Sequence, residues 1–574
     1  MLNNESTAKV RYHAPVLGRR SHHENFAFYG DLVANGNRRL ALDGVGIIGE
    51  KLVTKNDDLI EIEDNFDCMA IKGSVAVYTE LIDDKTSFFK INPDPIGACL
   101  VYKYEKNGVI AFSSDLKHLV DWLIGQNIQV KKSVFYQALL LSINDGAFGY
   151  SSYEDIYTLN SSEYIIAHGN KYRIANYGVE EFLKSEGSYH ELLDLTQADI
   201  EKTLYAISSS RFEKIAHLTG GMDSRLVVSA ISSANILRDF KIFCSGRKGL
   251  PDFDTAYSLC SVLNARMTNK PSLIQSKIPK DFEEYYKWSS DDNQGMLPNQ
   301  PTNVGILGNK QTIVLSGGYG ECLRGYHQHI RGYSLQSTID NLWPLHDAQG
   351  NVRSLATESV IHEIKSELGS YLVSKLVKGW TLNDALQLIY LQEKNRYFVG
   401  NISLSFSRHT PRIDPLYSLF GFKAAYKLDH EDRANRLLMF ELMERFNKKL
   451  TVLKFGTTSW PEALIKQKNI KIDMLPEGRD VEFERHESSN NILWLNEVSH
   501  ESKLEAIRLG APVWQVHHYQ QIQDASKQIL SRNPEFYQFF DKIRIGRLLN
   551  NVLNNRQSIR KVFQLYYALV WLYR

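Results

Sequence analysis

The sequence has few cysteines and no apolar stretch long enough to cross a membrane. Its 574 residues include five cysteines, which are scattered and form no Cys-x-x-Cys pair. A disulfide framework and a zinc site are therefore not expected. No run of about 18 apolar residues occurs, and the first residues lack the apolar core of a signal peptide. These absences favour a cytoplasmic protein without a membrane partner.

Neither sign of charge dominates the chain. Lysine and arginine number 67 against 66 aspartates and glutamates, which gives a net charge of +1. Nothing in this balance favours nucleic acid or an anionic membrane as a partner. The hydrophobic fraction of 43% and the charged fraction of 23% are typical of a globular protein. At about 150 residues per domain, the length predicts several structural units.

Residues 1–185 are expected to form a β-rich N-terminal domain. Short runs of β-branched and aromatic residues, separated by turn residues, lie at 73–81, 86–92, 98–105, 108–114 and 164–168. This pattern predicts packed antiparallel sheet. Residues 44–49 match Gly-x-Gly-x-x-Gly, but no helical pattern follows them. We interpret that match as a β-turn and not as a dinucleotide-binding loop.

Residues 186–574 are expected to form an α/β domain with a helical C-terminal part. Short apolar runs at 214–219, 240–245 and 312–316 alternate with turns and helical periodicities. That alternation is the signature of a parallel sheet with crossover helices. From about residue 380 onward the pattern is mostly helical. The apolar end, 562–574, is too short to span a membrane and predicts a packed terminal helix.

The stretch HLTGGMDSRLVVSA, residues 217–230, joins one of the apolar runs to a helical run. Gly220 and Gly221 would let the backbone turn tightly and approach a ligand closely. Asp223 and Ser224 stand where the N-cap of the helix is expected. A plain glycine turn capped by one of these two side chains is the alternative interpretation.

This junction predicts a site for a phosphate group. The free N–H groups and positive dipole end of a helix attract an anion, and the hydroxyls of Thr219 and Ser224 add donors. Asp223 is acidic, which suits a site where a metal ion lies between it and a phosphate. The chain has no Gly-x4-Gly-Lys-Ser/Thr loop, so the junction is not of the Walker type.

TGGMDS, residues 219–224, resembles the SGGxDS pyrophosphate loop of the N-type ATP pyrophosphatases. Three further segments narrow the resemblance to the asparagine synthetase superfamily, which includes β-lactam synthetases and lasso-peptide cyclases. They are SGRKGLPDFDTAYSLCSVLNA (245–265), with Asp252 before a helix; VLSGGYGECLRGYH (314–327), similar to LSGxGxDExFGGY; and RHTPRIDPLYS (408–418), similar to ExRxPFLD. The family resemblance implies an adenine-nucleotide α-hydrolase-like parallel sheet for residues 186–574.

The resemblance also implies roles for particular residues. When the two sequences are aligned without a gap, Glu321 falls on the aspartate that binds Mg²⁺ in the family. Glu321 would then share the ion with Asp223. An alignment with a one-residue gap would leave no metal-binding acid at that position. Arg436 is the candidate for the family's late lysine, and the alternatives are Arg433, Lys448, Lys449 and Lys454. Nucleotide contacts are expected from Thr219, Gly220, Gly221, Asp223, Ser224, Arg225, Ser245 and Gly317.

Two of these assignments leave alternatives open. Arg225 follows the loop directly and would either reach a phosphate or simply lie on the surface of the helix. Tyr319 and Tyr326 flank Glu321, where a tyrosine paired with a glutamate could accept a proton from an amine, although packing is their expected role.

Residues 73–120 resemble the later strands of a class II glutamine amidotransferase domain, with Asp94 and Gly97 on its Asp-x-x-Gly turn. The resemblance therefore implies a degenerate Ntn-like antiparallel α/β sandwich. A working domain of this class needs a cysteine as its processed N-terminal residue. This chain begins Met-Leu-Asn, and its first cysteine is Cys68. We therefore expect no glutamine hydrolysis.

Together these resemblances imply an ATP-dependent carbon–nitrogen ligase that uses ATP and Mg²⁺. A substrate carboxylate would attack the α-phosphorus, pyrophosphate would leave, and an amine would displace AMP from the acyl-adenylate. The expected partners are a small-molecule or peptide carboxylate, an amine, and other proteins of a biosynthetic pathway such as that of an antibiotic. Amidation of a glycan acid and a non-catalytic scaffold are the alternatives. A tRNA-modifying enzyme would carry a basic face or paired cysteines, which are not visible.

Overall fold

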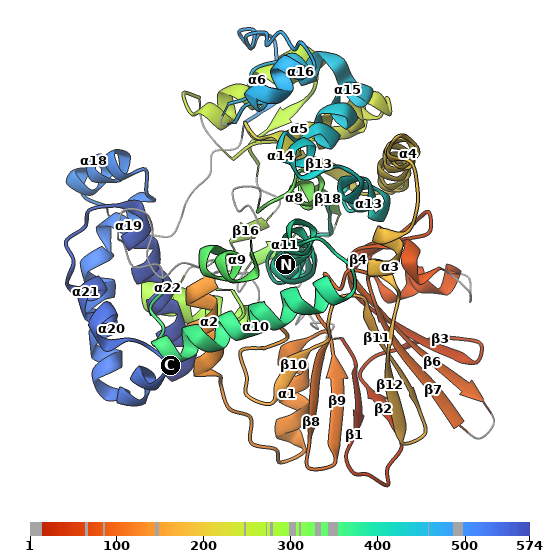
Figure 1. Ribbon diagram of the computed structural model, residues 1–574, viewed down its shortest axis with the longest axis vertical. Coiled ribbons are helices and arrows are strands. Elements are labelled where there is room, and N and C mark those ends of the chain that lie inside the picture. The colour runs from red at the N-terminus through yellow and green to blue at the C-terminus, as the bar shows by residue number, and fades with distance from the viewer. Residues whose placement is uncertain are drawn as a thin grey trace, which may run out of the picture.

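The computed structural model describes most of the chain and shows a mixed α/β protein (Figure 1). The residues described are 14–62, 67–83, 86–143, 148–245, 248–270, 273–275, 279–297, 306–308, 311–327, 334–342, 354–456, 458–485 and 498–574. The first residues, on which the absence of a signal peptide was predicted, and residues 246 and 247 of the second family-like segment lie outside this set.

The N-terminal half contains two antiparallel sheets. One has the strand order β10-β8-β9-β1-β2, and the other has the order β12-β11-β7-β6-β4-β3, with β5 paired to β4. Their bounds are β1 Val16–Arg19, β2 Ala27–Tyr29, β3 Val33–Asn35, β4 Arg38–Ile48, β5 Lys51–Val53, β6 Ile71–Asp83, β7 Thr86–Pro93, β8 Tyr102–Lys106, β9 Val109–Ser113, β10 Ile156–Thr158, β11 Glu163–His168 and β12 Lys171–Asn176.

An apolar core joins these two sheets. Leu17 and Phe112 from the first sheet cluster with Tyr78, Ile91 and Ile165 from the second, and all five are buried. Alternating side chains from both sheets therefore face one another, as expected for packed antiparallel layers. The five predicted strand regions are confirmed as strands, although the third begins at residue 102 and not at 98.

The interpretation of residues 44–49 as a β-turn is confirmed only at Gly49, which with Glu50 forms the turn between β4 and β5, and is wrong for residues 44–48. Residues 44–48 lie within β4, the longest partner of β6. A β-carbon on Gly44 would come within 2.0 Å of the carbonyl oxygen of Ser74 on β6, and the φ of Gly44 is +88°. Glycine is needed here because the two strands approach closely and not because the chain reverses.

A six-stranded parallel sheet forms the core of the second half. Its order is β19-β18-β13-β14-β15-β20, and every pair within it is parallel. The bounds are β13 Glu213–His217, β14 Phe240–Phe243, β15 Met267–Thr268, β18 Thr312–Leu315, β19 Arg412–Ile413 and β20 Phe483–Glu484. The three apolar runs in the sequence thus become β13, β14 and β18, as predicted. A separate antiparallel pair joins β16 (Leu273–Gln275) to β17 (Ile306–Gly308).

Helices follow the strands of the parallel sheet and pack around it. Those near the sheet are α4 (Tyr189–Ser208), α5 (Met222–Ser233), α6 (Pro251–Leu263), α8 (Gly320–Arg324), α13 (Leu419–Lys427), α14 (His430–Ala434), α15 (Leu437–Val452) and α16 (Glu462–Gln467). Helix α5 packs on both α15 and α8. In Figure 1, α5, α8 and α14 gather beside β13 and β18.

The remaining helices connect or flank the two sheet regions. They are α1 (Leu116–Gly125), α2 (Val134–Ile143), α3 (Val179–Lys184), α7 (Phe282–Asp292), α9 (Leu335–Leu342), α10 (Glu358–Val377), α11 (Leu382–Ile389), two π-helical turns (Tyr390–Lys394 and Arg396–Gly400), α12 (Asn401–Ser407), α18 (His500–Leu509), α19 (Val513–His517), α20 (Tyr519–Arg532), α21 (Lys542–Asn550) and α22 (Arg556–Tyr573). Of the helices in the described part of the chain, none is both long and apolar enough to span a bilayer.

The C-terminal segment is a packed helix, as predicted. Helix α22 contacts α2, α7 and α20, and its side chains from Val562 to Trp571 are buried. In Figure 1, the blue helices α18 to α22 gather at the left, near one end of the green α10. The apolar composition of this helix reflects burial against three neighbours.

The strand order of the parallel sheet places a crevice at one definite point. From β13 the chain moves outward through β14 to β15, and it later returns to the opposite side of β13 as β18. The connections that leave β13 and β18 therefore diverge at the carboxyl ends of two neighbouring strands. In open parallel sheets, ligands bind in the crevice at such a switch point.

The antiparallel region is fastened to the helices around the parallel sheet by buried polar groups. The carboxylate of Asp94 accepts hydrogen bonds from the N–H groups of Ala98 (3.0 Å) and Cys99 (2.8 Å) and from the Tyr417 hydroxyl (2.8 Å). Burial raises the pKa of Asp94 to about 6. Arg396 donates to the carbonyl of Gly97 at 2.8 Å. These contacts hold the Asp-x-x-Gly turn against the second half of the protein.

Candidate functional site

Two glycines let the turn after β18 approach the start of α5. A β-carbon on Gly320 would lie 2.4 Å from Oδ1 of Asp223, and one on Gly317 would lie 2.8 Å from the backbone nitrogen of Ser224. Larger residues would push the turn away from α5. The glycine-rich sequence after β18 therefore serves close packing against Asp223, and Gly317, which was expected to contact nucleotide, has this packing role in the structure.

The turn after β13 differs in one detail from the prediction. Helix α5 begins at Met222 with Gly221 as its N-cap, so Asp223 and Ser224 lie inside the first turn and are not N-caps. No side chain caps this helix end. The hydroxyl of Ser224 instead accepts from the backbone N–H of Thr219 at 3.1 Å and fixes the shape of the loop.

Two expected anion-binding donors already have protein partners, and the backbone N–H of Gly221 donates to the hydroxyl of Thr219 at 3.3 Å. The backbone N–H of Gly220 donates to Oδ1 of Asp252 at 2.8 Å. Asp252 is near the start of α6, in the family-like segment that follows β14. This bond ties the loops after β13 and β14 together. Ser245, predicted to contact nucleotide, is exposed just beyond β14.

Arg324 joins the two acidic side chains that the sequence predicted to face each other. Its Nε and Nη2 donate to Oδ1 and Oδ2 of Asp223, both at 3.1 Å, and Nη2 also donates to Oε1 of Glu321 at 2.5 Å. The side chains are partly exposed, at 17% for Arg324, 25% for Asp223 and 31% for Glu321. The prediction that residues 223 and 321 converge is confirmed, but a guanidinium lies between them.

The electrostatic surroundings of Glu321 bring in further charged groups. Burial raises its pKa, and the nearby charge of Asp223 raises it further, while Arg324, Arg436 and Lys394 lower it; the net shift is upward. Lys394 donates to the Tyr326 hydroxyl at 2.8 Å. Two carboxylates and three cations thus share one edge of the sheet, which leaves an excess of positive charge suited to an anionic ligand.

Arg436 was the predicted counterpart of the late lysine, and its charge acts on Glu321. It donates to the sulfur of Met222 at 3.2 Å and to the carbonyl of Ser459 at 3.0 Å. Its backbone is left-handed (φ +65°, ψ +31°) at the N-cap of α15. A left-handed non-glycine residue carries strain that is often found at functional sites. Tyr319, the N-cap of α8, has φ +69° and flanks the same edge.

The alternatives to Arg436 differ from it in burial and in their partners. Arg433 is buried and donates to Asp384 at 2.7 Å. Lys448, Lys449 and Lys454 are exposed on or just after α15. Arg436 stays the candidate because its charge lowers the pKa of Glu321.

The prediction that Arg225 contacts the nucleotide is wrong, and so is the alternative that it lies on the helix surface. Arg225 is fully buried and donates to the carbonyls of Leu450, Leu453 and Lys454. Its guanidinium carbon lies 3.8 Å from the centre of the Phe455 ring. Arg225 anchors the end of α15 to α5, which positions the loop that carries Gly456 against Gly220.

A buried aspartate, Asp414, fixes the start of the turn after β18 by hydrogen bonds. Asp414 accepts hydrogen bonds from the hydroxyls of Ser316 and Ser403, and Arg412 donates to Ser316 at 2.8 Å. The Pro-x-x-Asp part of the RHTPRIDPLYS segment thus has a structural role. Arg412, which replaces the phenylalanine of the family pattern, adds a donor to this network.

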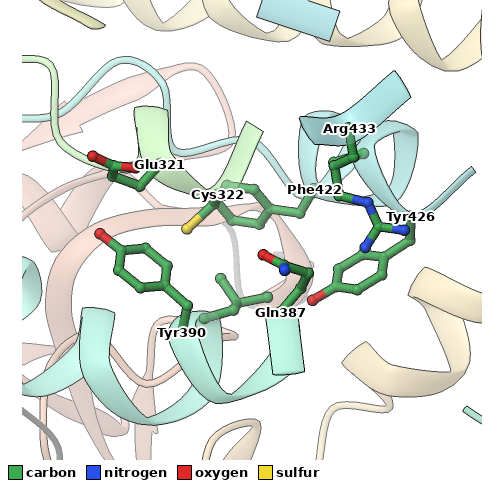
Figure 2. Close-up of a pocket in the computed structure, with 9 residues that line it drawn as sticks. Glu321, Cys322, Gln387, Tyr390, Phe422, Tyr426 and Arg433 are labelled. Carbon is green, nitrogen blue, oxygen red and sulfur yellow. The ribbon is translucent and has the colours of Figure 1, made fainter. Parts of the chain in front are cut away.

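A narrow pocket opens beside Glu321 (Figure 2). The Glu321 carboxylate and the Tyr390 hydroxyl lie at one end, and Tyr426 and Arg433 lie at the other, with the Cys322 sulfur between them. Leu391, Phe422, Ala425 and Gln387 complete the lining. Tyr390 also stacks on Tyr326, with ring centres 4.3 Å apart. The wall beside the acidic pair is therefore mostly apolar and aromatic.

The sequence prediction missed Arg324 and Lys394. Arg324 stands three residues after Glu321, a spacing that places both side chains on one face of a helix. That spacing is a signal the sequence does contain. Lys394 carries no comparable signal, because it reaches the site from a π-helical turn about seventy residues along the chain. In the described part of the chain, no group of three or more His, Cys, Asp or Glu side chains is arranged to hold a metal ion.

The cysteines of the antiparallel region are not activated nucleophiles. Burial raises the pKa of the Cys68 thiol, and it raises the pKa of Cys99 well above its usual value. A reactive cysteine needs the opposite shift, because the thiolate is the nucleophile.

The fold and the site define an α/β protein with a cluster of charged side chains at the switch point of a parallel sheet. No protein-family model matches the chain, and no curated protein matches it either. The assignment of function therefore depends on the residues of the crevice.

Proposed function

We propose that the protein is an ATP-dependent carbon–nitrogen ligase of the asparagine synthetase type, which activates a carboxylate as an acyl-adenylate for attack by an amine. One observation carries the proposal. The turns after β13 and β18 converge at the switch point of the sheet, where the charges of Asp223, Glu321 and Arg436 act on one another. These three are the catalytic residues that the sequence resemblance implies.

The coarse fold supports the same proposal. A parallel sheet with a glycine turn after its central strand suits an adenine-nucleotide α-hydrolase-like domain, and the paired antiparallel sheets suit a degenerate Ntn-like domain. The two-part organisation at about residue 185 is part of the proposal; α3 ends at Lys184 and α4 begins at Tyr189.

The fit of a Mg²⁺ ion to Asp223 and Glu321 is poor in this arrangement. Both carboxylates are ligands that the ion prefers. However, Nη2 of Arg324 already contacts an oxygen of each, at 3.1 Å and 2.5 Å. Nε contacts the second oxygen of Asp223 as well, so a divalent ion held by both residues would have to displace the guanidinium from Asp223. No step of the proposed reaction is therefore assigned to an ion at this position.

The residues of the crevice have separable tasks in the proposed reaction. The first turn of α5, which no side chain caps, presents N–H groups to the leaving pyrophosphate. Arg436 adds positive charge where negative charge develops on the leaving group. Asp223, Glu321 and Arg324 hold one another in place through their ion pairs. The aromatic wall formed by Tyr390 and Phe422 keeps water from the acyl-adenylate.

Exchange of labelled pyrophosphate into ATP tests the proposal directly. The exchange occurs only when a carboxylate is activated reversibly, so a panel of amino acids, short peptides and sugar acids serves as the substrate set. We expect exchange with at least one member and none without a carboxylate. ATP that fails to bind to the purified protein, together with no exchange on the whole panel, would reject the assignment.

The second candidate is a non-catalytic scaffold with the same fold. It is favoured by one feature, namely that protein groups already occupy two expected ligand contacts: Asp252 binds the Gly220 N–H, and Arg324 binds the acidic pair. Calorimetry with ATP separates the two candidates, because the scaffold binds no nucleotide in the crevice.

A further inference from the structure

A single nitrogen atom lies where two carboxylates converge. Nη2 of Arg324 is 3.1 Å from Oδ2 of Asp223 and 2.5 Å from Oε1 of Glu321. Nε of the same guanidinium is 3.1 Å from Oδ1 of Asp223, so the pairing with Asp223 is bidentate. Bidentate pairing fixes the plane of the guanidinium as well as its position.

The local backbone holds Arg324 in this position. Arg324 and Glu321 lie one turn apart on α8, whose sequence places both on the same face. Helix α8 ends directly after Arg324 at Gly325, which has φ +72°. Asp223 is fixed from the other side, because its side chain packs against the α-carbon of Gly320. Both ends of the bridge are therefore built into the turns that form the crevice.

A guanidinium and a divalent cation exclude each other here. Mg²⁺ holds carboxylate oxygens at about 2.0–2.1 Å and needs near-octahedral access to them. Arg324 already uses both oxygens of Asp223 and Oε1 of Glu321 through its N–H groups, and either cation reduces the repulsion between the two acids. The pair accommodates one of the two cations but not both.

We propose that Arg324 is a built-in cation that takes the position of a divalent metal ion between Asp223 and Glu321, so that these two residues bind no metal ion in this protein. The inference rests on the proposed ligase function only in naming the displaced ion as Mg²⁺. The bridge itself does not depend on that function, because it is formed by three side chains of this chain. Arg324 is thus a positioning residue that orders both carboxylates before any ligand binds.

Binding of Mn²⁺ to the nucleotide-free protein tests this inference, with electron paramagnetic resonance counting the free ion. The wild-type chain is expected to show no Mn²⁺ site that depends on Asp223. Arg324→Met removes the guanidinium but keeps a side chain of similar length, and it is expected to gain one Mn²⁺ per chain. The double variant Arg324→Met with Asp223→Asn is expected to lose that site again.

A matched control is available in α18. Glu505 and Arg508 form an exposed pair with the same three-residue spacing, and Arg508→Met should create no Mn²⁺ site. Added Mn²⁺ should raise the melting temperature of Arg324→Met but not that of Arg508→Met. The measurement on Arg324→Met is made on protein whose circular dichroism matches the wild type.

Two results would overturn the inference. One is a wild-type Mn²⁺ site that Asp223→Asn abolishes, a measurement that needs no folded Arg324 variant. The other is a folded Arg324→Met that binds no additional Mn²⁺. Both readouts are independent of ATP, so a protein that gains the ion as expected but exchanges no pyrophosphate would reject the ligase function and leave the inference standing.

Discussion

The α-carbon of Gly320 rests against the carboxylate of Asp223, and an added β-carbon would come within 2.4 Å of Oδ1 and 2.5 Å of Cγ. The residues come from different turns, since Gly320 begins α8 and Asp223 lies in the first turn of α5. Their contact sets the distance between the two turns, and therefore the geometry of the crevice.

Gly320→Ala should separate the two turns and misplace Asp223. We expect the rate of pyrophosphate exchange to fall by about 10²-fold, as for a misplaced group at an active site, with a stability loss of about 1–3 kcal/mol from overpacking. Exchange kinetics and thermal unfolding measure the two effects. Gly546→Ala in α21 is the control, because no atom lies within 4 Å of its added β-carbon; it should leave exchange unchanged and add slightly to stability. Normal exchange by Gly320→Ala would show that this contact does not set the site.

Removing either acidic charge should also slow the reaction. Asp223→Asn and Glu321→Gln are each expected to lower exchange by about 10²–10³-fold, the scale for loss of one electrostatic group in an active site. The double variant should lose little more than the worse single one, because both residues orient the same guanidinium. Asp340→Asn, which breaks an exposed ion pair with Lys365, should retain full exchange. Strictly multiplicative losses in the double variant would contradict a shared role.

Arg225 should matter for stability and not for ligand contact. Arg225→Met leaves the carbonyls of Leu450, Leu453 and Lys454 without their donor, at a cost of about 1–3 kcal/mol for each buried acceptor that stays unpaired. We expect a large drop in melting temperature. Lys448→Met removes an exposed cation from the same helix and should cause no drop. An unchanged melting temperature combined with weaker ATP binding would restore the nucleotide-binding role for Arg225.

Glu393 should make stability depend on pH. Burial raises the pKa of this carboxyl from 4.5 to about 7, and Oε2 has no hydrogen-bond partner among the residues the structure describes. The folded state therefore holds a proton that the unfolded state releases near pH 4.5, so stability falls as the pH rises from about 4.5 to 7 and is constant above that range. The shift corresponds to about 3 kcal/mol.

Glu393→Gln should remove this dependence. Its stability relative to the wild type should be unchanged near pH 4.5 and higher by up to about 3 kcal/mol at pH 8, because the neutral amide needs no ionisation. Thermal unfolding at a series of pH values measures the difference. Glu477→Gln, at an exposed glutamate, is the control. A constant difference between variant and wild type across this range would show that Glu393 ionises normally.

The protein should release no glutamate from glutamine. The thiols of Cys68 and Cys99 have raised pKa values, so neither forms a thiolate readily at neutral pH. A coupled glutamate assay should give the same background for the wild type and for Cys68→Ser. Release that disappears in Cys68→Ser would show that the antiparallel region retains a glutaminase.

Local sequence was enough to predict most elements that surround the crevice. The apolar runs of β13, β14 and β18 are continuous because both faces of a parallel sheet are covered, and that pattern can be recognised without the fold. The glycines at 220 and 317 predict turns because glycine adopts backbone conformations that other residues avoid, which is also a local property. Residues 44–49 show the limit, because a glycine that permits close strand contact has the same sequence signal as one that permits a turn.

The sequence by itself determined that the turns carrying Asp223 and Glu321 would meet at one edge of the sheet, since parallel strands end on the same side. Only the tertiary structure decided which nearby arginine contacts these two acids. Arg225 follows Ser224 directly, and its position on α5 turns it toward the end of α15, where three carbonyls bind it. Arg324 is one helical turn from Glu321 and meets Asp223 across the crevice. Each guanidinium lies where buried or charged oxygens are concentrated, and that distribution exists only after distant segments have packed together.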